Sequence, residues 1–359
     1  MERNNTQLIV VLGMHRSGTS AITRGLQVLG VQLGNRLLPA VENDNNKGYW
    51  EDTDVNDLNI EMMQEIKIDW DYIAPITSKD VEMLCKKGYK LRAIELLRKK
   101  VGDDKIFGLK DPRIAKLLPF WKVVFDQCGF DMSYILALRH PFSVAKSLSK
   151  RGFKETDRSY YLWLEYVISS LTHTQNELSI VVDYDRLMQS PKKEIGRVSK
   201  QLNLKLNQSE MQQYLAGFLD NTLRHTVYTI DDLLVNHNIP PLLKEIYTAL
   251  LDAASDKVEV SNVKFRSQVE KWEEEFIRLS PTLKMAENLT QALEEREKEN
   301  ASFTQLNVER DVHIKNLTQA LEERDNIIHG MVSSVTWRIT RPFRLVKNYL
   351  SSKGDMKNV

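Results

Sequence analysis

The chain has 359 residues and a mass of 41.6 kDa, which suits one large domain with an extension. Hydrophobic residues make up 42% and charged residues 28%, a balance that excludes wholesale disorder. Because 50 Lys and Arg stand against 49 Asp and Glu, the net charge is only +1. This excludes a uniformly basic or uniformly acidic protein, and we expect no nucleic-acid partner.

Two cysteines, Cys85 and Cys128, are too few for a disulfide framework or a cysteine-rich zinc site, so a reduced, cytoplasmic setting is expected. The apolar run near the start covers only residues 8–12, and polar residues precede it. This fits neither a signal peptide nor a membrane span, and no later run reaches the ~18 apolar residues that a spanning helix needs.

The first ~260 residues alternate between strand and helix patterns. A buried-strand run at 8–12 breaks at Gly13, and a helical pattern follows over 17–29 with Gly30 as its stop. Further segments follow in the same alternation: strands at 106–109, 133–138 and 179–183, and amphipathic helices at 158–178 and 191–204. Strand, crossover helix and strand predict an α/β domain, residues 1–265, with a parallel sheet covered on both faces.

Residues 268–329 are rich in Glu, Lys, Gln and Leu, and they contain a repeat. Residues 288–296 recur unchanged as 316–324, an offset of 28 residues or four heptads. This offset keeps four leucines on one helical stripe: Leu289, Leu293, Leu317 and Leu321. We therefore expect an α-helical coiled-coil stalk that joins copies into a homo-oligomer. The alternative is a single solvated helix, because polar residues interrupt the stripe: Arg296, Asn300, Asn307 and Arg310.

Residues 330–359 form a basic tail, with six basic residues and one acidic residue. Aromatic and aliphatic residues alternate with Arg and Lys, and Pro342 is expected to start or kink a helix. Such a segment suits an anionic membrane surface or a partner's groove, or else it packs on its own stalk. Residues 270–329 hold eight basic and fourteen acidic residues, and residues 1–269 hold 36 and 34. The overall charge of +1 is therefore a cancellation.

The first strand leads through a glycine-containing loop, 13–20, into a helix. Backbone amides at such a loop converge on an anion, and the helix dipole adds to them. The spacing is that of a Walker A loop, but Thr19 replaces its lysine, which argues against an ATPase or kinase. Arg16 can supply the missing charge, unless it merely pairs with a carboxylate. The expected phosphate-binding residues are His15, Arg16, Ser17, Gly18, Thr19 and Ser20.

The segment His-Arg-Ser-Gly-Thr-Ser, 15–20, resembles the 5′-phosphosulfate loop of sulfotransferases, enzymes that use 3′-phosphoadenosine 5′-phosphosulfate (PAPS). Arg139 ends a predicted strand and Ser147 follows in the next helix, similar to the pair that holds the cofactor's 3′-phosphate in that family. Both side chains can reach one phosphate group. The resemblance covers about residues 7–205 and implies a P-loop, sulfotransferase-like fold. The Gly-x-x-Gly-x-x-Lys loop that helps to bind the 3′-phosphate in cytosolic animal sulfotransferases is not evident.

Other segments are similar to recurring blocks of a bacterial-type branch of the same family: 37–39, 45–51, 110–113, 118–121 and 182–187. Lys110 and Asp111 end a strand at the sheet edge where ligands bind. We expect Lys110 to touch the transferring sulfuryl group and Asp111 to position Arg16 or substrate, with a plain Asp-Pro turn as the alternative. Tyr184 is expected to reach the adenine.

Sulfuryl transfer needs a base for the acceptor hydroxyl and positive charge at the departing oxygen. Arg16 suits the second role. Glu51 is the first candidate for the base, because its block resembles the one that carries the catalytic glutamate of Golgi-type glycan sulfotransferases, and Tyr49 and Trp50 could wall the pocket. Asp52 is the second candidate, although both carboxylates could simply cap the following helix.

The sequence also contains two histidines near the expected site, and their expected roles differ. His15 could touch the phosphosulfate or substrate, so it is a further candidate for catalysis. His140 is expected to have a structural role in a turn. No His, Cys or Asp spacing suggests a metal, and the family does not require one.

The resemblance therefore predicts a PAPS-dependent sulfotransferase that acts on a hydroxyl of a glycan or glycan-lipid acceptor. The tail, with Trp-Arg-Ile-Thr-Arg-Pro at 337–342, looks like those of bacterial surface-polysaccharide enzymes, which implies a peripheral location on the inner face of the cytoplasmic membrane. The alternative hypotheses are a P-loop kinase and a non-catalytic scaffold for polysaccharide assembly.

Overall fold

The computed structural model describes residues 6–42, 45–153, 155–220 and 228–355. Residues 356–359 of the predicted tail therefore lie outside the described residues. Contacts divide the chain into two compact units, one ending at Glu287 and the other beginning at Asn288.

A parallel four-stranded sheet, in the order β2-β1-β3-β4, forms the centre of the first unit. Its strands are β1 (Gln7–Leu12), β2 (Ile106–Lys110), β3 (Asp131–Leu138) and β4 (Leu178–Asp183). All four predicted strands are confirmed. The chain leaves β1 for β2 on one side and then crosses to β3 on the other, so the strand order reverses between β1 and β3. In such sheets the carboxyl ends of the strands at this point form a ligand-binding crevice.

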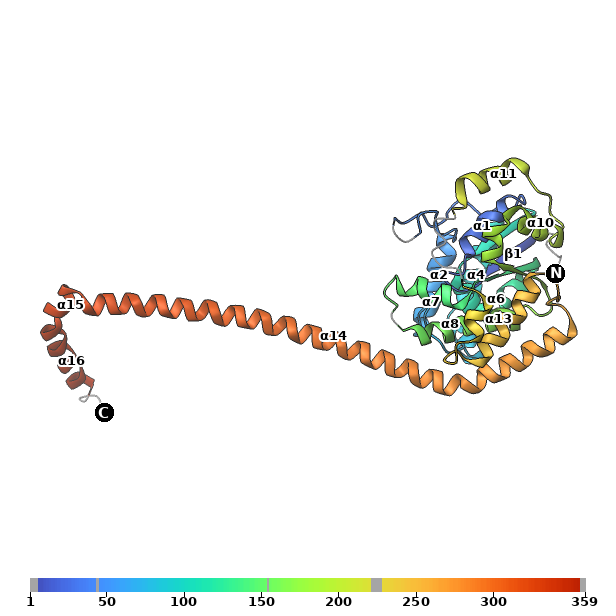
Figure 1. Ribbon diagram of the computed structural model, residues 1–359. Coiled ribbons are helices and arrows are strands. Elements are labelled where there is room, and N and C mark those ends of the chain that lie inside the picture. Colours follow the sequence, from blue (N-terminus) through green and yellow to red (C-terminus); the bar gives the residue numbers. More distant parts are fainter. Residues whose placement is uncertain (1–5, 43–44, 154, 221–227, 356–359) are drawn as a thin grey trace. The chain divides into compact units, whose positions relative to one another are not determined.

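Helices cover both faces of the sheet, as Figure 1 shows. Along β1, Leu8, Val10 and Leu12 belong to one hydrophobic cluster, whereas Ile9 and Val11 belong to another. This alternation follows from the two-residue period of a strand and explains why β1 is apolar throughout. The predicted α/β fold class is confirmed.

The larger cluster lies under α2 (Thr53–Glu65), α4 (Tyr89–Val101), α6 (Leu118–Cys128), α8 (Thr156–His173) and α13 (Pro241–Ala254). The smaller one lies under α1 (Thr19–Gln27) and α10 (Pro191–Gln201). The helix predicted over 158–178 ends earlier than expected, because Leu178 already begins β4. The remaining elements of this unit are α3 (Ser78–Lys86), α5 (Pro112–Lys116), α7 (Pro141–Ser149), α9 (Tyr184–Gln189), α11 (Gln208–Gln213), the π-helix η1 (Tyr214–Phe218) and α12 (Ile230–Leu234).

Helix α14 (Val263–Ser333) is 71 residues long and begins in the first unit. Its first turns bury Phe265, Val269, Trp272 and Phe276 in the larger cluster. The Trp272 Nε1 also donates to Glu245 at 3.0 Å. The compact unit consequently extends to Glu287, beyond the boundary at 265 that composition suggested, because these apolar positions pack on the α/β core.

The second unit contains the rest of α14, then α15 (Val335–Ile339) and α16 (Arg341–Asp355). Pro342 stands in the first turn of α16, as predicted. The side chain of Ser334 caps α15, and the Arg344 guanidinium lies 3.6 Å from the centre of the Trp337 ring. None of the described helices is long and apolar enough to cross a bilayer.

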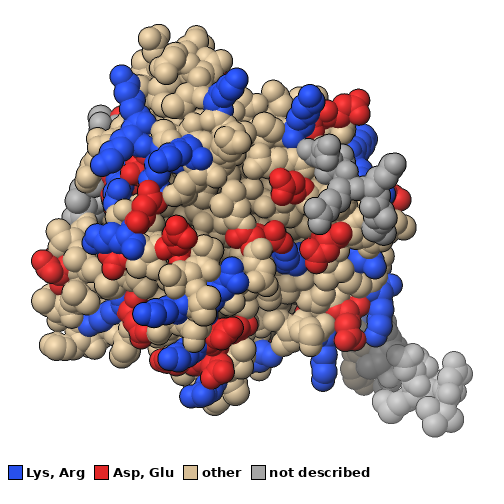
Figure 2. Space-filling view, turned by 90° about the vertical axis from the view of Figure 1, so that its right-hand side faces the viewer, with Lys and Arg blue, Asp and Glu red and all other residues tan. Residues whose placement is uncertain are grey.

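Basic and acidic side chains are interspersed on the face of the first unit seen in Figure 2. This agrees with the near-equal charge counts of residues 1–269, which hold 36 basic and 34 acidic residues.

Candidate active site

The loop that follows β1 depends on two glycines. Gly13 has φ of 143°, and a Cβ there would lie 3.0 Å from Ala137. Gly18, with φ of 84°, immediately precedes α1, and a Cβ there would lie 2.1 Å from the Tyr184 ring. Only glycine allows both the left-handed backbone and the close approach of Tyr184. The loop is thereby held at the carboxyl end of β1, with the N-terminus of α1 as one wall.

The segment after β3 meets this loop although the two are far apart in sequence. Arg16 Nε donates to Ser147 Oγ at 2.8 Å, and Arg139 Nη1 donates to the Arg16 carbonyl at 2.8 Å. The Arg139 guanidinium also lies 4.6 Å from the centre of the Tyr184 ring. The two sequence motifs therefore form one cluster at the point where the strand order reverses.

A cavity of about 450 Å³ opens over this cluster. Ten of the predicted site residues line it: His15, Arg16, Gly18, Thr19, Ser20, Glu51, Lys110, Arg139, Ser147 and Tyr184. Ser17 and Asp52 do not belong to its described lining. Ser17 is buried within the loop, and its amide donates to the Met14 carbonyl at 3.2 Å.

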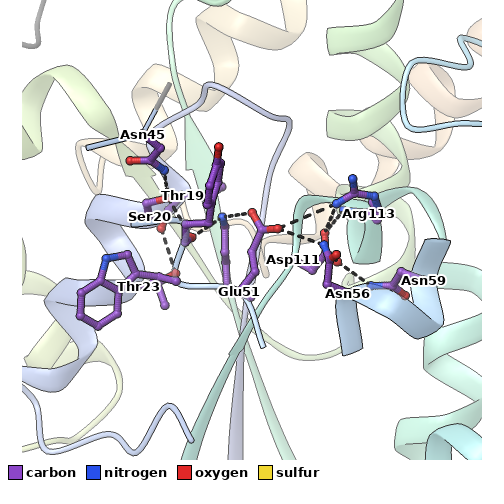
Figure 3. A network of polar contacts seen from close by, with 12 residues as sticks. Thr19, Ser20, Thr23, Asn45, Glu51, Asn56, Asn59, Asp111 and Arg113 are labelled. Atoms are coloured by element: carbon purple, nitrogen blue, oxygen red, sulfur yellow. Dashed lines mark hydrogen bonds and ion pairs between the residues drawn. The ribbon is translucent and has the colours of Figure 1, made fainter. Parts of the chain in front are cut away.

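Glu51 lines the cavity as a buried carboxylate, and it belongs to the polar network in Figure 3. Its Oε1 lies 2.6 Å from Lys110 Nζ, and its Oε2 accepts from Asn56 Nδ2 at 3.1 Å. Lys110 also donates to the Tyr49 carbonyl at 2.8 Å. Burial raises the pKa of Glu51, and the positive charge of Lys110 opposes that rise. The site thus contains a carboxyl group of raised pKa beside a fixed cation.

Asp52 has a different role, which corrects the expectation that it could serve as a base. Its Oδ1 accepts from the amides of Asp54 at 3.0 Å and Val55 at 3.2 Å, so it caps α2. Its Oδ2 lies 2.7 Å from Lys100 Nζ. The capping interpretation therefore holds for Asp52 alone, whereas the neighbouring Glu51 faces the cavity.

The two aromatic residues before Glu51 point in different directions. Tyr49 lines the cavity, as expected for a residue that could stack on a sugar ring. Trp50 turns away, because its ring packs edge-on against Phe218 at 5.7 Å and lies under the Arg24 guanidinium at 5.7 Å. The positive φ of Trp50, 59°, explains how adjacent side chains take such different directions.

The two histidines differ as the sequence suggested. His15 lines the cavity, packs edge-on against Trp70 at 4.9 Å, and has an Nε2 without a hydrogen-bond partner among the described residues. Burial, and then the nearby cations led by Arg113, hold the pKa of His15 well below its ordinary value. His140 caps α7, since its Nδ1 accepts from the Phe142 amide at 3.1 Å. His140 is thus a structural residue.

Asp111 does not contact Arg16 through a hydrogen bond that the structure shows. Instead it caps α5 and accepts from Asn56 at 3.1 Å and Asn59 at 3.0 Å, as seen in Figure 3. Arg113 lies 3.3 Å from Asp111 and 3.8 Å from Glu51. Asp111 consequently supports the Glu51 network from behind, and the Asp-Pro turn accounts for its position.

Several cavity residues escaped the sequence analysis. One face of α7 and its C-cap supply Ser143, Lys146 and Lys150 beside the predicted Ser147, at a spacing that a helical pattern search could have found. Ser143 is fully buried, and its Oγ has no hydrogen-bond partner within the described parts of the chain. Loops supply Arg151, Leu219 and Asp220, whereas Asn45, Asn46 and Lys47 belong to the block at 45–51, in which the sequence analysis gave them no role. Within the described ranges, no group of three His, Cys, Asp or Glu residues could hold a metal ion.

No family model matches this sequence, and no curated protein does. Solved structures of similar fold include the sulfotransferase domain from the Synechococcus PCC 7002 olefin synthase, at 16% identity over 72% of this chain and 97% of that one, with a TM-score of 0.38. The sulfotransferase domain from the curacin biosynthetic pathway is similar at 14% identity, over 69% and 98% of the two chains, with a TM-score of 0.42. Sulfotransferase STF1 from Mycobacterium tuberculosis H37Rv is similar at 13% identity, over 69% and 78%, with a TM-score of 0.34. At these TM-scores the likenesses carry no functional conclusion, which must come from the cavity itself.

Proposed function

We propose that this chain is a PAPS-dependent sulfotransferase that moves a sulfuryl group to a hydroxyl by in-line displacement. The observation that carries the proposal is the junction of two anion-binding segments around Arg16. Its side chain donates to Ser147, and its carbonyl accepts from Arg139. Thr19 stands where a nucleoside triphosphatase has its lysine, which favours a ligand other than ATP.

The cavity residues fit a donor with two separate anionic groups. The loop at 13–20 and the start of α1 offer amides to one group, and Arg139 and Ser147 lie beside the place for the other. Ser143 Oγ and His15 Nε2 are buried polar atoms without a partner among the described residues, as expected where a polar ligand completes the site. Tyr184 packs over Gly18 and lines the cavity, and we assign it to the adenine of the donor. The donor supplies the activated sulfuryl group.

The roles of the protein groups follow from their charges. Glu51 would accept the proton of the acceptor hydroxyl, because it is the buried carboxylate at the cavity and its pKa is raised toward a useful range. Lys110 and Arg16 would stabilise the negative charge that develops on the departing oxygen. Glu51→Gln should consequently abolish transfer while adenosine 3′,5′-bisphosphate still binds. Full activity in that variant would remove Glu51 as the base.

Calorimetry with adenosine 3′,5′-bisphosphate and with ATP plus magnesium tests the proposal against its rivals. The proposal requires bisphosphate binding that Arg139→Ala abolishes and that Arg98→Ala, an exposed position on α4, leaves unchanged. Binding of ATP alone would identify a kinase-like enzyme. Absence of binding by either nucleotide would favour a scaffold.

The proposed acceptor is a glycan or glycan-lipid precursor of a surface polysaccharide, met at the inner face of the cytoplasmic membrane. Tyr49 at the cavity and the basic helix α16 support this. The full chain should sediment together with anionic liposomes, and deletion of 330–359 should abolish this co-sedimentation. With neutral liposomes, the full chain and the shortened chain should both stay in solution. Unchanged pelleting of the shortened chain would refute membrane docking by the tail.

A further inference from the structure

Helix α14 carries an apolar stripe that the described chain leaves uncovered beyond residue 288. Leu289, Leu293, Leu317 and Leu321 are 55%, 63%, 52% and 51% exposed, and Phe303 and Ile314 on the same stripe are 64% and 52% exposed. Exposure of this kind at heptad spacing is typical of a helix that pairs with another helix. The polar members of the stripe limit how a second copy can lie against it.

A parallel pair in register would place each stripe residue opposite its own counterpart. Arg296, Arg310 and Arg324 would then each face an identical arginine inside the seam. Three layers of like charge are unfavourable, because each guanidinium loses water and gains a repelling neighbour. Leu306, which flanks the stripe, would lie beside Asp311 of the second copy. Paired asparagines at 300 and 307 are the feature that would favour this arrangement.

An antiparallel pair centred near residue 305 removes all three arginine layers. Leu289 then faces Leu321 of the second copy, and Leu293 faces Leu317, so the two copies of the internal repeat pack against each other. The remaining layers pair unlike residues: Arg296 with Ile314, Asn300 with Arg310, Phe303 with Asn307, and Arg324 with Ala286. At the centre, Leu306 lies beside Leu306 of the second copy, where each covers apolar surface of the other.

We propose that residues 286–324 of α14 form an antiparallel two-stranded coiled coil with a second copy of this chain. The charge pattern of the seam selects the orientation, and the repeat supplies the register. This pairing explains the internal repeat, because residues 288–296 of one chain pack against residues 316–324 of the other. This inference is independent of the proposed enzymatic activity, since it uses no residue of the cavity.

Disulfide trapping in the full chain tests the orientation. Cys85→Ser removes the half-buried native thiol, whereas Cys128 is buried and stays. Leu293→Cys and Leu317→Cys are then made as two separate proteins, one of them with a longer tag. Mild oxidation of the mixture should give the mixed disulfide, and each protein alone should remain uncrosslinked. Val308→Cys, on a different side of the helix, is the control and should crosslink in neither case.

Self-crosslinking of Leu293→Cys and of Leu317→Cys, each alone, would show a parallel pair and overturn the proposal. Sedimentation equilibrium of the unmodified chain should give a dimer, and a monomer or trimer would also overturn it.

Discussion

Loss of the Lys110 side chain should destabilise the first unit strongly, because it leaves the buried Glu51 carboxylate without its nearest cation, while Arg113 lies 3.8 Å away. Only 2% of the Lys110 side chain and 6% of the Glu51 side chain are exposed, and the two groups lie 2.6 Å apart. Removal of one partner from a buried pair of this kind costs about 3–5 kcal/mol. Lys110→Met, which keeps an unbranched side chain but removes the ammonium group, should therefore lower the free energy of unfolding by about 3–5 kcal/mol at pH 8.

The loss should become smaller at acidic pH. Burial already raises the pKa of Glu51, and without Lys110 that pKa must rise further. A carboxyl group with a raised folded-state pKa favours the folded state most below its unfolded pKa, and the folded protein loses stability as pH rises through the folded value. The difference between wild type and Lys110→Met should thus be smaller at pH 5 than at pH 8.

Urea unfolding of four proteins measures these effects: wild type, Lys110→Met, Glu51→Gln and the double variant. The double variant should be more stable than the sum of the single losses predicts, because neither charge is left alone. Lys99→Met, at an exposed position of α4, serves as the control and should change little. A loss below about 1 kcal/mol in Lys110→Met, or a loss equal at both pH values, would refute the buried pair.

Three other changes probe separate parts of the site. Gly18→Ala should abolish binding of adenosine 3′,5′-bisphosphate in calorimetry, because the added Cβ would lie 2.1 Å from the Tyr184 ring, whereas Gly30→Ala, with no atom within 4 Å, should retain it. Asp52→Ala should lower the free energy of unfolding by about 1–2 kcal/mol, because α2 loses its N-cap, and bisphosphate binding should remain. Loss of binding with unchanged stability would contradict the capping role. Urea unfolding should show that His15→Gln loses less stability than wild type between pH 7.5 and pH 5.5. The depressed pKa of His15 makes the wild-type folded state lose stability as pH falls below about 6.5, and glutamine removes this loss. Equal pH dependence in both proteins would contradict a buried neutral imidazole.

The parts of the fold and site that were predictable from sequence are those fixed by local signals. The strand, glycine loop and helix around 13–20 have a recognisable motif within a few residues. The pair Arg139 and Ser147 has one as well. Their union around Arg16 followed from placing both segments at the carboxyl edge of one sheet, which the strand order confirms.

Other features depend on contacts between distant segments, which a single sequence does not reveal. Glu51 and Asp52 are adjacent and chemically alike, and only the backbone turn at Trp50 decides which carboxylate faces the cavity. Likewise, Phe265 and Trp272 fit an oligomerising helix as well as a helix that packs on the α/β core. The core contacts decide between these, and they move the unit boundary to Glu287.

If Arg139 and Ser147 complete one site with the loop at 13–20, a 3′-phosphate on the ligand should strengthen binding. Calorimetry should show that adenosine 3′,5′-bisphosphate binds more tightly than adenosine 5′-phosphate by about 1.5–3 kcal/mol, roughly 10- to 150-fold, as expected for charge-assisted hydrogen bonds. This preference should disappear in Arg139→Ala and shrink in Ser147→Ala, while Arg98→Ala retains it. Equal affinity of the wild-type protein for the two nucleotides, or a preference that survives in Arg139→Ala, would contradict the account.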